Sequence, residues 1–184
     1  RIRVVQEAGR RRSGLEWSHD SCRLAYIETD NGKDTHGELW TYDVCMDTFT
    51  FVMEDVSGSE ITWSYDDTYL AFTEDIGREI VIRVLDLSAP EIPIFEHAIS
   101  DTGRPQLSWS PTSNQFVFIT RDFFSRRSNI SIADVEAGTV THISHYNSQY
   151  RLVEWSPDGQ HIAVAADFWH SPTYYFEDQV YVMD

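Results

Sequence analysis

The sequence predicts an all-β protein of four similar β-sheets, and three observations lead to this fold class. Tryptophan recurs every 46 residues, at Trp17, Trp63, Trp109 and Trp155, and the 184 residues have the length of four such repeats. Repeats of this length are typical of proteins in which similar units stack on one another. Apolar and polar residues alternate around each tryptophan as in β-strands, and no stretch has a helical period of useful length. We therefore expect a single domain over residues 1–184.

Each repeat begins with two short strands joined by a tight turn. The best-formed turn contains Pro157, Asp158 and Gly159. Proline presets φ, aspartate bonds to its own backbone, and glycine accepts a positive φ. The four copies of this unit are LEWSHDSCRLAY (15–26), ITWSYDDTYLAF (61–72), LSWSPTSNQFVF (107–118) and VEWSPDGQHIAV (153–164).

Two further strands complete each repeat. The third strand alternates apolar and polar residues and closes on an aspartate that is expected to cap the following turn. These aspartates are Asp43, Asp86, Asp134 and Asp184. A fourth, outer strand is expected ahead of every tryptophan, at residues 1–6, 49–52, 92–95 and 140–143.

The second strand of each repeat predicts how the sheets stack. Its larger residues point to one face and its smaller residues to the other, because side chains alternate along a strand. The larger residues are Tyr26, Phe72, Phe118 and Val164, and the smaller ones are Ala25, Ala71, Val117 and Ala163. We expect the bulky face of one sheet to pack on the small face of the next.

The repeat resembles that of a known family. Trp-Ser-Pro-Asp-Gly, followed by an aliphatic-alanine-aliphatic strand and a strand ending at residues 180–184, is similar to the TolB-type, WD-like β-propeller repeat. The resemblance covers nearly the whole chain and is strongest in the fourth repeat. It implies a β-propeller of four four-stranded sheets, or blades, in which residues 1–6 complete the last blade and close the ring. The alternative is an arc of a larger ring, since TolB-like propellers usually have six or more blades.

The charge balance restricts the partners. The formal net charge is −16, from 30 acidic and 14 basic residues. Such a chain repels a phosphate backbone, so we expect no nucleic-acid partner. No apolar run approaches the length that spans a bilayer. Basic proteins or cations fit this charge, and so does an acidic surface that only keeps the protein in solution.

The two cysteines lie at corresponding ends of neighbouring predicted strands. Cys22 directly precedes the strand at 24–27, and Cys45 directly follows the strand at 39–44. If these strands pair antiparallel, the thiols come close enough for a disulfide, whereas otherwise they are two unpaired thiols. A disulfide would indicate an oxidising compartment, where TolB-like propellers are usually found. We therefore expect an extracytoplasmic protein, periplasmic or secreted.

Aromatic residues concentrate in two loops on one side of the predicted propeller. The loops after the second strands, residues 31–38, 76–79, 123–129 and 168–179, share that side. The last two loops have the composition of a protein-binding surface, although their rings could also form a local cap over the blades. The candidate partner-binding residues are Phe123, Phe124, Arg126, Phe168, Trp169, His170, Tyr174, Tyr175 and Phe176.

An acidic residue stands at the start of each of these loops. Repeated around a ring, four carboxylates could gather a cation or a basic peptide at the mouth of the channel, but each could equally cap its own turn. The residues are Asp30, Asp75, Asp122 and Asp167. Asp34 and His36 add hard ligands near Asp30 without the spacing of a calcium loop, so no metal site is predicted.

The sequence lacks the motifs of common catalytic sites. It contains no Gly-x-Ser-x-Gly elbow, no His-Glu-x-x-His and no phosphate-binding glycine loop. We therefore predict a non-catalytic scaffold without a cofactor, which binds another protein or protein complex through the aromatic loops. Two alternatives follow from the resemblance: an accessory propeller of a prolyl-oligopeptidase-like peptidase, and a lyase or hydrolase with a metal in the channel.

Overall fold

The computed structural model describes residues 9–30, 36–57, 60–77, 79–99, 105–121, 128–144, 149–169 and 176–183. Within these ranges the chain forms fifteen β-strands and no helix. The described residues therefore contain no helix that could span a membrane. The all-β prediction is confirmed.

The strands form four antiparallel sheets, and each sheet follows the order of the chain. A tryptophan of the repeat ends the first strand of every sheet, which confirms one sheet for each 46-residue repeat. The first sheet contains β1 (Arg10–Trp17), β2 (Arg23–Asp30), β3 (Gly37–Asp43) and β4 (Thr48–Val56). The second contains β5 (Ile61–Trp63), β6 (Tyr69–Ile76), β7 (Glu79–Asp86) and β8 (Phe95–Ile99). The third contains β9 (Leu107–Trp109), β10 (Gln115–Arg121), β11 (Ser128–Asp134) and β12 (Thr139–His142), and the fourth β13 (Gln149–Trp155), β14 (Ile162–Trp169) and β15 (Phe176–Met183).

One outer strand lies later in the chain than predicted. We expected it at residues 92–95, but β8 runs from Phe95 to Ile99. Pro90 and Pro93 explain the shift, because proline has no N–H to donate to a neighbouring strand. Ile94 is the first residue after them to pair, donating its main-chain N–H to the oxygen of Val84 over 2.9 Å.

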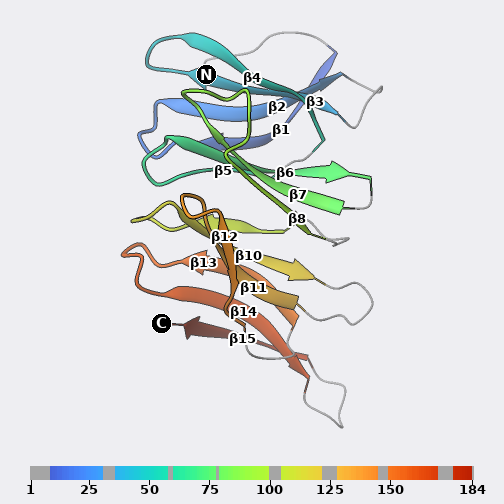
Figure 1. Ribbon diagram of the computed structural model, residues 1–184, viewed down its shortest axis with the longest axis vertical. Helices are drawn as coiled ribbons and strands as arrows, with labels where there is room; N and C mark the ends of the chain where they lie inside the picture. Colours follow the sequence, from blue (N-terminus) through green and yellow to red (C-terminus); the bar gives the residue numbers. More distant parts are fainter. Residues whose placement is uncertain are drawn as a thin grey trace.

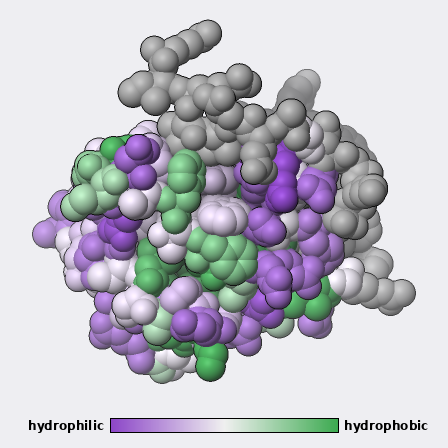
Figure 2. Space-filling view, turned by 90° about the horizontal axis from the view of Figure 1, so that it is seen from above, coloured by the Kyte–Doolittle hydropathy of each residue, from purple (hydrophilic) through white to green (hydrophobic). Residues whose placement is uncertain are grey.

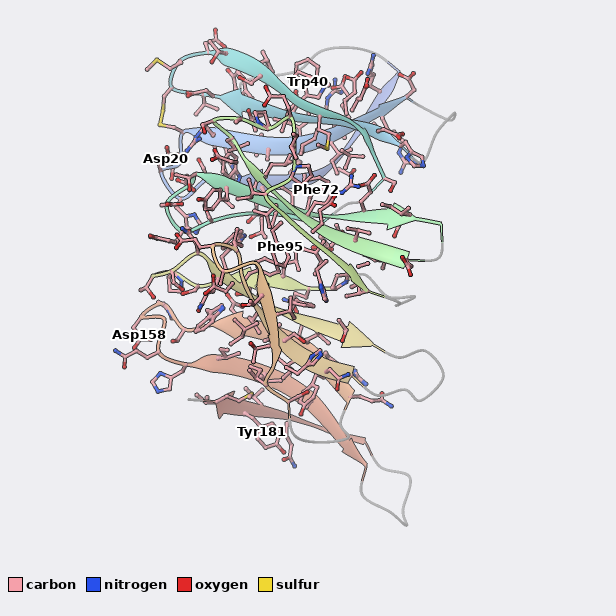
Figure 3. All side chains as sticks on the ribbon, in the orientation of Figure 1. Asp20, Trp40, Phe72, Phe95, Asp158 and Tyr181 are labelled. Carbon is pink, nitrogen blue, oxygen red and sulfur yellow. A yellow bond between two sulfur atoms is a disulfide. The ribbon has the colours of Figure 1, made fainter. Side chains whose placement is uncertain are left out.

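Bulky faces pack on small faces, as the alternation of large and small residues predicted, but the bulky face of each sheet lies on the sheet before it in the chain and not on the next one. Figure 1 shows the sheets one upon another in chain order. Phe72 packs with Ala25 between the first and second sheets, and Phe118 packs with Ala71 between the second and third. Val164 packs with Val117 between the third and fourth sheets. Figure 3 shows Phe72 and Phe95 in successive interfaces.

The described sheets form one stack. The first and last sheets lie at opposite ends of the stack in Figure 1, and the fourth sheet has three described strands. Residues 1–6, which were expected to complete that sheet and close the ring, lie outside the described residues. Closure of the ring therefore stays a prediction.

The predicted disulfide is present. Cys22 and Cys45 are bonded, and their Cα atoms lie 5.4 Å apart. The bond joins the start of β2 to the turn after β3, and these two strands pair antiparallel. The main-chain N–H of Val44 also donates to the oxygen of Cys22 over 2.7 Å, so the two segments are already held together beside the bridge.

Candidate functional site

A cleft of about 530 Å³ opens at one edge of the first sheet. It lies where β2 ends, β3 begins and β4 ends, on the side where the loops after the second strands were expected. β6, β10 and β14 end on that same side, at the right of Figure 1. The cleft is lined by Arg10, Glu28, Asp30, His36, Gly37, Glu38, Glu54 and Asp55.

The register of β1 on β2 brings arginines against the carboxylates of this cleft. Arg10 pairs with Asp30 and Arg12 with Glu28 across the two strands. The Arg10 guanidinium lies 3.4 Å from both Glu28 and Asp30 and 3.5 Å from Glu38. Arg12 Nη2 lies 2.8 Å from Glu28 Oε2, and the Glu28 side chain is only 9% exposed. A buried carboxylate is thus compensated by two guanidinium groups.

The opposite wall of the cleft comes from the end of β4. His36 Nδ1 lies 3.1 Å from Asp55 Oδ1, and Glu54 stands next to this pair. Gly37 keeps the walls close together, because a Cβ atom there would lie 2.5 Å from the main-chain oxygen of Glu28. The lining carries five carboxylates against one guanidinium and one imidazole, so the cleft is acidic.

A second buried carboxylate continues this acidic region onto the next sheet. Glu74 of β6 stands one repeat after Glu28 and forms an ion pair with Arg83, which also lies 2.8 Å from Glu96. Burial raises the pKa of Glu74; Arg83 opposes this rise, and the charge of Asp55 adds to it. The 46-residue spacing of Glu28 and Glu74 was a signal in the sequence that could have identified both residues, and sequence reasoning missed it.

The predicted ring of aspartates is described only in part. Asp30 lies in the cleft beside Arg10. Asp75 has an exposed side chain, and its main-chain N–H donates to Ser57 Oγ over 2.8 Å. The backbone of Asp167 lies in β14 opposite Asp178, and Asp122 is outside the described residues. The ring stays a prediction.

Most of the predicted partner-binding residues are outside the described ranges. This applies to Phe123, Phe124, Arg126, His170, Tyr174 and Tyr175. Phe168 and Trp169 end β14, and Phe176 begins β15 directly opposite Trp169. The backbone therefore brings these three residues together at the end of the fourth sheet, on the same side of the stack as the cleft.

The described side chains do not assemble a metal site. Among them, no group of three or more histidine, cysteine, aspartate or glutamate residues could hold a metal ion. Asp34, considered above with Asp30 and His36, is outside the described residues, and His36 contacts Asp55.

Comparison with known proteins identifies the class of fold. No protein-family model and no curated protein sequence matches this chain. TolB from Acinetobacter baumannii is a similar solved structure, with 19% identity and a TM-score of 0.67 over 98% of this chain and 42% of that one. The β-propeller domain of the Trilobed protease from Pyrococcus furiosus has 14% identity and a TM-score of 0.68 over 95% of this chain and 55% of that one.

A lyase shares the fold as well. An oligogalacturonate lyase solved in complex with manganese has 16% identity and a TM-score of 0.64, covering 91% of this chain and 48% of that one. This chain thus spans about half the length of these proteins, or less. It has the fold of TolB-type and peptidase β-propeller domains, as its repeats predicted. Likeness at this identity establishes the fold and leaves the activity open.

Proposed function

We propose that this chain is a non-catalytic β-propeller that binds another protein, and that its acidic cleft receives a basic segment of the partner. The observation that carries this proposal is the lining of the cleft, in which five carboxylates surround about 530 Å³ of space. Carboxylates bind arginine and lysine through charge-assisted hydrogen bonds, which are about twice as strong as neutral ones.

Arg10 supports the chemistry of this proposal from within the chain. Its guanidinium already lies among Glu28, Asp30 and Glu38. This half of the cleft therefore accepts a guanidinium group. Glu54 and Asp55 form the other half, where His36 pairs with Asp55. An arginine or lysine of a partner would add its charge there.

The aromatic loops extend the proposed surface. The backbones of Trp169 and Phe176 pair at the end of the fourth sheet on the same side as the cleft, and aromatic residues are enriched at protein interfaces. We further propose an extracytoplasmic location, periplasmic or secreted. The Cys22–Cys45 disulfide and the TolB-like fold support it, since disulfides persist in oxidising compartments.

The alternative is an accessory propeller of a larger peptidase. The likeness to the protease propeller domain supports this alternative at the level of fold. Its active site would lie outside this chain. Peptide binding without turnover agrees with either role, whereas hydrolysis of peptides by the isolated chain would contradict both.

The proposal is tested with a fluorescent hexa-lysine peptide and a neutral peptide of the same length. We expect the wild-type chain to bind only the basic peptide, and we expect Glu54→Gln with Asp55→Asn to weaken binding about tenfold, as measured by fluorescence anisotropy. The matched control is Glu91→Gln with Glu136→Gln, which removes the same charge from exposed turn positions in the second and third repeats. Equal weakening by both double variants would reveal general attraction to an acidic protein and would overturn the assignment of the cleft.

A further inference from the structure

Two histidines face the contact between the second and third sheets. His97 lies on β8 and His142 on β12, which are the outer strands of these two sheets. The contact is inside the stack. Figure 2 looks onto the first sheet, where hydrophilic and apolar side chains are mixed, and the contact between the second and third sheets lies beneath that surface. Its burial therefore does not depend on what covers either end of the stack.

The register of the strands turns both imidazoles into this contact. His97 pairs with Ile82, which is fully buried in the core between the two sheets. On the third sheet, Phe118 pairs with Ser131 and Ser131 pairs with His142, so these three side chains share the face that is turned to the second sheet. The centroids of the His97 and Phe118 rings lie 5.7 Å apart, so His97 joins the two sheets directly.

The surroundings of the two imidazoles suit uncharged rings. The centroid of the His97 ring lies 6.5 Å from that of Phe95, which Figure 3 labels, and Phe95 and Phe118 both belong to the core of this contact. His142 Nδ1 lies 2.8 Å from the Oγ atom of Ser131, a fully buried residue. A proton on His97 would place a charge against aromatic rings and away from water, which costs free energy.

The strands packed around His97 place few charged groups on its side. On the second sheet, the titratable residues that share its face stand at or next to the ends of their strands, and they are Tyr69, Asp75 and Asp86. Arg83 and Glu96 point to the opposite face, where they pair over 2.8 Å. Among the described residues of the third sheet, His142 is the titratable group on the facing side. A charge on His97 would therefore be opposed by a second imidazole.

We propose that His97 and His142 make the contact between the second and third sheets sensitive to acid. The contact is firm near neutral pH, where both imidazoles are uncharged, and weakens when they take up protons. This inference goes beyond the proposed function, because it concerns a junction inside the stack and not the binding of a basic segment in the cleft. It gives the chain a built-in response to a mildly acidic compartment.

The direction of the pH dependence follows from burial. Burial lowers the pKa of His97 below 6.5, and the charge of His142 lowers this pKa further. The unfolded chain therefore binds more protons than the folded chain once the pH falls below 6.5. The stability contributed by uncharged His97 is fully present above pH 6.5 and is lost as the pH falls through the lowered pKa. Burial instead raises the pKa of Glu74, which changes stability in the opposite direction.

Urea unfolding at pH 7.5 and at pH 5.5 tests the proposal. We expect the unfolding midpoint of wild type to be lower at pH 5.5, and His97→Gln to lose most of this difference. His142→Gln should lose a smaller part, because it removes only the weaker cause of the lowered His97 pKa. His161→Gln is the matched control, since His161 precedes β14 on the fourth sheet, and it should keep the wild-type difference. An equal difference in His97→Gln and wild type would overturn the proposal.

Nuclear magnetic resonance titration of the imidazole protons supplies a measurement on wild type itself, should a variant fail to fold. We expect the His97 resonance to titrate below pH 6.5 in wild type and closer to 6.5 in His142→Gln. A His97 pKa above 6.5 would show that the neighbouring aromatic rings stabilise the charged imidazole through a cation–π contact, and it would overturn the proposal.

Hydrogen exchange of wild type locates the response in the stack. After correction for the intrinsic effect of pH on exchange, the main-chain amides of β8 and β12 should exchange faster at pH 5.5 than at pH 7.5. The amides of β2 and β3 in the first sheet should not. An equal increase in all of these strands would place the acid response outside the histidine pair and would overturn the proposal.

Discussion

At the scale of single residues, the serine after three of the four repeated tryptophans fixes the hairpin that follows. Ser64 Oγ donates to Asp66 over 2.8 Å and accepts the main-chain N–H of Tyr69 over 2.9 Å. The same pair of bonds recurs around Ser18 and Ser156. Figure 3 shows Asp20 and Asp158, the acceptors in those two copies, on the same side of the stack. The Trp-Ser motif therefore encodes a turn.

We expect Ser64→Ala to lower the free energy of unfolding by about 1 to 3 kcal/mol, because Ser64 is fully buried and Tyr69 loses a hydrogen-bond acceptor. Urea unfolding at pH 7 measures the change. Burial tends to raise the pKa of Asp66, but hydrogen bonds from Thr68 and Ser64 outweigh it and lower the pKa below 3.8. The stability contributed by that lowered pKa is present above pH 3.8 and is lost as the pH falls further.

Ser156→Ala is the matched control for this substitution. Ser156 makes the same bonds but is partly exposed, so water can replace them. We expect Ser156→Ala to lower the free energy of unfolding by less than Ser64→Ala does. We also expect the difference in free energy of unfolding between wild type and Ser64→Ala to become smaller below pH 3.8. Equal losses at both positions would show that burial does not set the cost.

At the scale of elements, the disulfide holds the first sheet at the turns after β1 and β3. It closes a loop of sequence separation 23, for which the restriction of the unfolded chain predicts a stabilisation of about 3 kcal/mol. We expect Cys22→Ser with Cys45→Ser to lose about that amount in urea unfolding. Reductant should destabilise wild type and leave the double variant unchanged.

Mass spectrometry checks the bridge independently. Alkylation should label no thiol in the native chain and two after reduction, because both cysteines are in the bond. Labelling before reduction, or a reductant effect on the double variant, would contradict this assignment.

At the scale of the whole molecule, the stability of the stack lies in the interfaces between sheets. Phe72 is fully buried between the first and second sheets, so we expect Phe72→Ala to cost about 3 to 5 kcal/mol. Phe49→Ala makes the same change at a residue that is 45% exposed and should cost about 1 kcal/mol or less. Urea unfolding at a low protein concentration measures both. Similar costs would mean that packing between sheets is not the main source of stability.

Hydrogen bonds also connect the hairpins of neighbouring sheets, and the sequence repeat does not predict them. Asp67 is buried with a φ of 59° and accepts the main-chain N–H groups of His19 and Asp20 from the hairpin of the first sheet. Its carboxylate also lies 3.0 Å from His19 Nδ1. In the sequence Asp67 is one of several aspartates in predicted turns. Its role cannot be seen there, because its partners lie 47 and 48 residues away along the chain.

The sequence by itself determined the number of sheets, the order of their strands and the way their faces pack. These features follow from the local alternation of apolar and polar residues and from a motif repeated every 46 residues. Both patterns can be recognised within a single strand or turn. It also placed Cys22 and Cys45 close enough to suggest a bond, because the two strands are neighbours in the chain. Asp43 was expected to cap its turn, and it accepts the main-chain N–H groups of Cys45 and Met46.

Only the tertiary structure decided the cleft and which of the repeated tryptophans are buried. The cleft depends on the register that sets Arg10 and Arg12 against Glu28, and a shift of one residue would turn those side chains to the other face. Likewise, Trp17 and Trp63 are the same residue in the same motif, yet one is exposed and the other buried. Their difference is set by whether another sheet lies against them, which depends on position in the stack and not on the local sequence.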